Sequence, residues 1–146
     1  MILDSLLEFS DGGDISAAAS TVLSDNVINM QDARDIGNGQ PLYLVIQIDA
    51  AVVGTSSTVN FRLRSDSSAA IHATTSTAHI ETGAIAEATL VAGYTIVIPL
   101  PIEGNAYEQY LGVQAVIGTA TTTAGTYSAF LTLDPIGWKA YPDAVN

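Results

Sequence analysis

Apolar and polar residues are distributed along this chain in short segments whose spacing is typical of β-strands. The clearest is residues 58–65, where Val59, Phe61 and Leu63 alternate with polar side chains. A period of two places one face of such a strand in the core and the other in water. Residues 42–48 instead form a nearly continuous apolar run rich in β-branched residues, which predicts a strand covered on both faces.

The remaining strands are predicted between turns rich in Gly, Ser, Thr and Pro. They are expected at residues 27–30, 78–81, 89–92, 94–100, 110–117 and 126–134, with a weaker strand or extended arm within 15–24. About eight strands at this spacing, without a convincing long helix, predict an all-β antiparallel sandwich or barrel.

The 146 residues have the length of one domain, and no linker divides them. We therefore expect a single domain over 1–146, with an N-terminal arm at 1–14 and a C-terminal tail at 135–146. The arm carries apolar side chains at 2, 3, 6, 7 and 9 and is predicted to end in a turn at residues 10–14.

Composition excludes several classes of function. There is no cysteine, so disulfides, thiolate catalysis and cysteine-bound zinc are excluded. Fifteen acidic and four basic residues give a net charge of −11, which disfavours binding to nucleic acid and to anionic membranes. Only 13% of the residues are charged, and Ser and Thr take their place. No signal peptide is expected, and the longest uncharged apolar stretch, residues 90–102, is too short to span a bilayer.

The residues that carry chemistry do not form a recognisable constellation. His72 and His79 are seven positions apart, so they would lie on opposite faces of a strand, and we interpret both as solvated loop residues. No Gly-x-Ser-x-Gly motif is present, and the carboxylates closest in sequence lie in predicted loops. We expect no catalytic residue, no metal site and no cofactor.

A few side chains are better candidates for contacts with a partner. Trp138 and Tyr141 flank Lys139 near the C-terminus, and aromatic residues beside a cation often bind partners, although they also serve to pack a tail onto a sandwich. Arg34 lies between Asp32 and Asp35 in a predicted loop. Arg62 and Arg64 share the predicted wet face of their strand, where pairing with surface acids is expected.

Three blocks of sequence resemble a known family. They are residues 1–11 (MILDSLLEFSD), residues 33–43 (ARDIGNGQPLY), and residues 125–134 (GTYSAFLTLD) followed by 138–143 (WKAYPD). Together they resemble the capsid cement, or decoration, proteins of tailed bacteriophages, of the type found on a short-tailed Bordetella phage. The blocks reach from one end of the chain to the other, whereas residues 66–92 carry no matching block.

The resemblance implies a jelly-roll fold, a homodimer, and a place on the outer surface of an icosahedral shell of major capsid protein, after synthesis in the cytoplasm of a bacterial host. The homodimer contact is expected at residues 42–48 or 2–9. In such a protein we expect the contacts with the shell to involve seven residues: Leu3, Leu6, Leu7, Phe9, Arg34, Trp138 and Tyr141.

Two other functions remain open for a β-sandwich of this composition. A carbohydrate-binding or phage-fibre module would need an exposed row of aromatic side chains, and none is visible in the sequence. A β-sandwich hydrolase would need the catalytic constellation that is missing.

Overall fold

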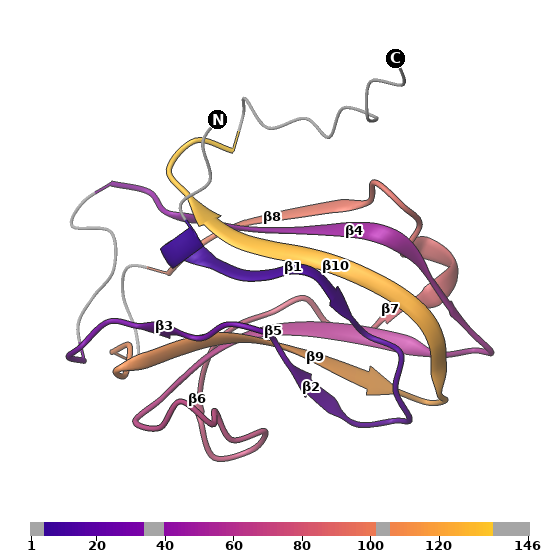
Figure 1. The fold of residues 1–146 in the computed structure, drawn as a ribbon, viewed down its shortest axis with the longest axis horizontal. Coiled ribbons are helices and arrows are strands. Elements are labelled where there is room, and N and C mark those ends of the chain that lie inside the picture. Colours follow the sequence, from indigo (N-terminus) through magenta and orange to yellow (C-terminus); the bar gives the residue numbers. More distant parts are fainter. Residues whose placement is uncertain (1–4, 34–39, 102–105, 136–146) are drawn as a thin grey trace.

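Two antiparallel β-sheets pack face to face in the computed structural model, which describes residues 5–33, 40–101 and 106–135 (Figure 1). Hydrophobic side chains from both sheets meet between them, and the helical content of the described residues is limited to two short 3-10 turns, η1 (Ser5–Leu7) and η2 (Glu87–Thr89). The prediction of an all-β antiparallel sandwich is confirmed.

The first sheet, sheet A, contains four strands in the order β1-β10-β4-β8. Their bounds are β1 (Glu8–Asp14), β10 (Thr122–Thr132), β4 (Tyr43–Gly54) and β8 (Thr95–Pro99). The first and last strands of the chain are therefore neighbours, and β1 and β8 form the two edges.

The second sheet, sheet B, is built around β9 and β5. Its strands are β2 (Thr21–Leu23), β3 (Ile28–Asn29), β9 (Tyr110–Gly118), β5 (Thr58–Asp66), β6 (Thr77–Glu81) and β7 (Ile85–Ala86). Both β2 and β3 pair with β9, and both β6 and β7 pair with β5. Counting each of these two pairs as one interrupted strand gives eight strands in two four-stranded sheets, connected as in a jelly roll.

The N-terminal segment differs from its prediction. Residues 8–14 do not form an arm but the edge strand β1, which pairs with β10 from Glu8↔Phe130 to Asp14↔Thr126. The expected turn at 10–14 is instead a pair of irregularities within this strand. Gly12 adopts a φ of +69°, and a Cβ on Gly13 would lie 1.9 Å from the hydroxyl oxygen of Ser10, so glycine permits a bulge where the sequence suggested a break.

Two other predicted elements change as well. Residues 87–89 form η2, so the strand expected at 89–92 is absent, and residue 90 returns to the core as the buried Leu90. The strand predicted at 126–134 begins earlier, with residues 122–125 as the start of β10, because Thr122 is buried and its hydroxyl donates to the carbonyl of Ile15. Tertiary hydrogen bonds thus extend β10 beyond its local apolar pattern.

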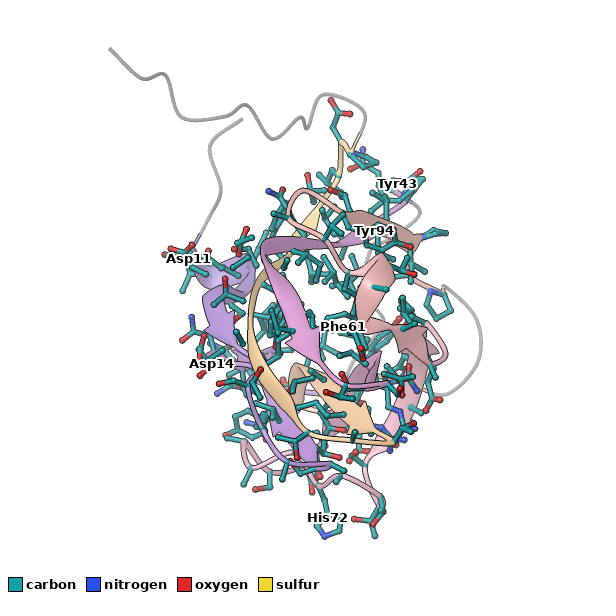
Figure 2. All side chains as sticks on the ribbon, turned by 90° about the vertical axis from the view of Figure 1, so that its right-hand side faces the viewer. Asp11, Asp14, Tyr43, Phe61, His72 and Tyr94 are labelled. Atoms are coloured by element: carbon teal, nitrogen blue, oxygen red, sulfur yellow. The ribbon has the colours of Figure 1, made fainter. Side chains whose placement is uncertain are left out.

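The core lies between the inner faces of the two sheets. Phe61 of β5 and Tyr127 of β10 meet there with ring centroids 5.3 Å apart, and Figure 2 shows Phe61 in the interior. Val59, Phe61 and Leu63 are all fully buried, which confirms the alternating pattern of that strand. Phe9, at the start of β1, also lies in this core and is not exposed.

The position of Phe9 generates a test of stability. Phe9→Ala should lower the free energy of unfolding by about 3–5 kcal/mol, because truncating a buried phenylalanine leaves a cavity. Leu6→Ala is the matched control: its side chain is 76% exposed, so a change within about 0.5 kcal/mol is expected. Urea unfolding of both variants measures the difference, and equal stability of the two would contradict the placement of Phe9 in the core.

Candidate partner-binding surfaces

The residues expected to contact a partner differ in their exposure to solvent. Leu6 and Leu7 are exposed in η1, as an interface residue must be. Phe9 is buried in the core, so its assignment to an adhesive arm is wrong: the pairing of β1 with β10 makes residue 9 part of sheet A, with its side chain between the two sheets. The other four predicted residues, Leu3, Arg34, Trp138 and Tyr141, lie outside the described residues.

A groove lies beside η1 at the corner where the edges of the two sheets meet. Its volume is about 640 Å³, and it is lined by Ser5, Leu6, Glu8, Asn26, Val27, Ile28, Asn29 and Gln31. One wall belongs to the segment leading into β1 and the other to the segment around β3. The backbone N–H of Asn26 holds the walls together by donating to the carbonyl of Phe9 at 2.8 Å.

The lining combines apolar side chains with neutral amides and one carboxylate. Such a surface suits an extended peptide segment, whose apolar side chains pack against Leu6, Val27 and Ile28 while the amides bond its backbone. Sequence analysis identified only the η1 side of this groove. The 26–31 side was missed because its pattern predicted only a short strand at 27–30, and these residues become a wall of the groove only through the contact with β1.

Of the six large apolar side chains that are exposed in the described residues, five lie at the two ends of sheet A, and the sixth, Val97, lies in the edge strand β8. Leu6, Leu7 and Leu133 lie at the end where β1 begins and β10 finishes, since Glu8 is paired with Phe130. Val53 and Val91 lie at the opposite end, beyond the buried part of β4, where Val52 N–H donates to Leu90 C=O. The molecule thus presents apolar contacts at both ends of one layer.

The predicted dimer strand at residues 42–48 lies inside sheet A. β4 is paired with β10 on one side and with β8 on the other, so it offers no backbone edge to a partner. Leu44, Val45, Ile46 and Ile48 are all buried, which confirms a strand covered on both faces. Any contact of this strand with a second copy is therefore restricted to side chains on the outer face.

The outer face of sheet B is covered by the loop between β5 and β6. The carboxylate of Asp66 starts this loop by accepting hydrogen bonds from the backbone N–H groups of His72, at 3.0 Å, and Ser68, at 3.2 Å. These bonds, that of His72 first, lower the pKa of Asp66. The loop then places Ile71 against Gly112 of β9, so closely that a Cβ there would lie 2.6 Å from the Ile71 side chain.

The same loop changes the environment of two cations. Arg64 was expected on a wet face, but it is buried and donates to the carbonyl of Ser76 at 3.0 Å. One carboxylate oxygen of Glu81 lies 3.3 Å from both Arg62 Nε and Arg64 Nη2. Both arginines therefore bind groups within the domain and do not form a basic patch that is available to a partner.

His79 belongs to a compact polar cluster and is not a solvated loop residue. It lies in β6, half-buried, with its ring stacked on Tyr107 at a centroid distance of 4.0 Å. Its Nε2 is 2.7 Å from the hydroxyl oxygen of Ser65, which also accepts the backbone N–H of Glu108 at 3.0 Å. In the neutral tautomer with the proton on Nδ1, the Ser65 hydroxyl donates to Nε2. The hydroxyl of Thr77 donates to the Glu108 carboxylate, with 2.7 Å between the two oxygens.

Ser65, His79 and Glu108 lie together here, and their burial determines whether the serine can act as a nucleophile. Ser65 is fully buried, and its oxygen already accepts one hydrogen bond and shares another with His79. A nucleophile must reach a substrate atom, and this hydroxyl reaches none. The cluster therefore joins β5, β6 and the segment before β9.

His72, by contrast, is exposed at one end of the molecule, as predicted (Figure 2). Its Nδ1 accepts the backbone N–H of Thr75 at 3.2 Å and so closes a turn of the loop. Within the described residues, no three His, Asp or Glu side chains are placed to share a metal ion. None of the helices in those residues is long and apolar enough to cross a membrane.

The His79 cluster generates a prediction for pH dependence. Burial lowers the pKa of His79 below its usual 6.5, against the opposing attraction of the Glu108 carboxylate. The unfolded chain therefore takes up a proton near pH 6.5 that the folded cluster refuses, and stability falls as the pH drops through that value. His79→Gln keeps a hydrogen-bonding side chain without this titration, so its stability should fall less between about pH 7.5 and about pH 5.5.

Urea unfolding at the two pH values measures this effect. His72→Gln is the matched control, because it removes the exposed histidine and should retain the pH dependence of the original protein. The assignment is contradicted if His79→Gln and His72→Gln respond to pH alike.

Comparison with known proteins places the chain in a family. Among curated proteins, no match to the chain is found. A family model, Bbp16, matches residues 9–131, a span from the buried Phe9 at the start of β1 almost to the end of β10. The prefix stands for Bordetella bacteriophage, so the family is phage-related. Because the match includes nearly all of the jelly roll, the chain belongs to the Bbp16 family.

Proposed function

We propose that this protein is a capsid decoration protein, which binds the outer surface of an icosahedral phage shell and stabilises it by bridging neighbouring major capsid subunits. The observation that carries the proposal is membership of a phage-related family by a jelly roll with exposed apolar side chains at both ends of sheet A, Leu6 and Leu7 at one end and Val53 and Val91 at the other. Contacts at two ends allow one molecule to engage two subunits.

Bridging follows from weak contacts made together. Once one end is bound, the second contact becomes effectively intramolecular, which raises the overall affinity by about 10² to 10⁴. A homodimer doubles the number of contacts, and we propose that the protein acts as one. The acidic character of the chain supports a position outside the shell, where no contact with the packaged genome is needed and like charge keeps particles apart.

We propose a structural role without catalysis. The buried Ser65 hydroxyl supports this assignment, as does the use of Arg62 and Arg64 inside the domain. For the alternative of a carbohydrate-binding module, no supporting feature is found in the described residues, whose large exposed apolar side chains are all Leu or Val.

The direct test is to mix the purified protein with undecorated, expanded shells of its phage and to image them by electron microscopy. Decorated shells should carry regular extra density on their outer surface and should resist heat or osmotic shock better than bare shells. Absence of binding, or unchanged rupture of filled shells after binding, would overturn the proposed function.

Site-directed variants locate the contact. Leu6→Ser with Leu7→Ser should weaken shell binding at least about tenfold, because each loses apolar surface that the contact would bury. A companion variant, Val53→Ser with Val91→Ser, removes exposed apolar surface from the other end of sheet A and should weaken binding as well. Equal, unchanged binding of both variants in a cosedimentation assay would contradict the assignment of apolar contacts to the ends of this sheet.

The oligomeric state is tested separately. Sedimentation at micromolar concentration should report about twice the chain mass of 15.1 kDa, because a two-fold dimer reuses one surface patch on both copies. A monomer at all concentrations, together with single copies on the shell surface, would contradict the homodimer.

A further inference from the structure

β8 is an edge strand whose outer side has no partner strand in the described part of the chain. It pairs only with β4, in a register from Tyr43↔Pro99 to Gln47↔Thr95. Figure 1 shows it at the edge of sheet A opposite β1. An unpaired edge presents a row of backbone N–H and C=O groups to which another extended segment can bind.

The hydrogen bonds at the two ends of β8 establish which backbone groups face outward. Leu100 N–H donates to Leu42 C=O at 2.8 Å, and Ile48 N–H donates to Tyr94 C=O at 2.9 Å. Hydrogen-bonded pairs alternate along an antiparallel ladder, so the even-numbered residues of β8 face β4. The N–H and C=O groups of Thr95 and Val97 therefore point to the free edge, as does the carbonyl of Pro99.

Proline supports this orientation independently. Pro99 has no N–H, and a strand accommodates proline only where that N–H would face away from the ladder. Val97 occupies the same orientation two residues earlier. The edge thus has two free donors and ends at a residue that cannot donate, which limits an added strand to a short register centred on 95–97.

The side chains of β8 also leave room for a further strand. Ile96 and Ile98 pack against the core but are only partly buried, so the apolar interior is incompletely covered at this edge. On the other face, Val97 is 45% exposed beside the buried Val45. An added strand with apolar side chains would cover the isoleucines on one face and Val97 on the other.

This edge also lacks the usual protection against unwanted pairing. Natural edge strands commonly carry charged residues, whereas residues 88–102 contain no charged side chain. Only the shortness of β8 and Pro99 restrict pairing. The segment that fits is uncharged where it pairs and basic at its flanks, since the chain as a whole has a charge of −11.

We propose that the free edge of β8 binds an extended segment of a major capsid subunit as an added strand, with basic residues flanking the paired part. This inference rests on the proposed function and names the contact that secures the protein to the shell. A second copy of the chain is disfavoured as the occupant because it brings a further charge of −11 without a free cation in β8 to offset it.

Val97→Pro tests the edge directly. It removes an N–H that β8 does not use within its own sheet, in an orientation that Pro99 shows to be compatible with the strand, so folding should be preserved. Cosedimentation with undecorated shells should show at least about tenfold weaker binding, since a bond to the partner is lost and the added strand is displaced. Val97→Lys should weaken binding as well, whereas Ala69→Lys, which adds the same charge to the exposed loop between β5 and β6, should leave binding unchanged and is the control.

A second measurement is independent of any variant. In hydrogen exchange followed by mass spectrometry, shell binding should slow exchange in the peptide containing residues 94–100. Unchanged exchange there on bound shells, or full binding by Val97→Pro, would overturn the β8 contact while leaving the proposed function intact. Failure of the unaltered protein to bind shells would instead remove the proposed function and this contact with it. Conversion of a dimer to a monomer by Val97→Pro would assign the edge to a second copy and overturn the shell segment as occupant.

Discussion

The pairing of β10 with both β1 and β4 is the constraint on which the rest of this structure depends. It joins the first and last strands of the fold to the longest one, so sheet A forms only after almost the whole chain has been made. At its start, Gly125 adopts a φ of +143° where a Cβ would lie 3.1 Å from the backbone of Val52. Nearby, the Thr122 hydroxyl donates to the carbonyl of Ile15. These contacts lie where the register between β10 and β4 shifts, between Thr122 and Tyr127.

The outer faces of the two sheets are covered to different extents. Sheet B is covered by its own β5–β6 loop, in which the carbonyl of Ser76 accepts a hydrogen bond from Arg64 and Ile71 packs against the sheet at Gly112. Sheet A keeps apolar side chains at its ends and a free edge at β8. The exposed apolar side chains and the free edge thus belong to sheet A, while sheet B contributes the 26–31 wall of the groove.

The strand order also separates two candidate contact surfaces. The groove near η1 lies beside β1, and β8 is three strand spacings away, about 14 Å across the sheet. The two features face opposite sides of the same rigid layer. On a shell, a contact at each would connect two neighbours without any change in conformation, which is the requirement for bridging.

The sequence alone determined the class of fold, because alternation along residues 58–65 and the continuous run at 42–48 each leave few options for burial. It also identified Leu6 and Leu7 as exposed candidates. Local pattern could not reveal β1, since Gly12 and Gly13 signal a turn unless the partner strand β10 is known. It misjudged His79 and Arg64 for the same reason: Ser65, Tyr107 and Ser76, which bury them, lie 12 to 28 positions away in the chain. The free edge of β8 belongs to this second group, because an unpaired strand is recognised only once every other strand has been given its partner.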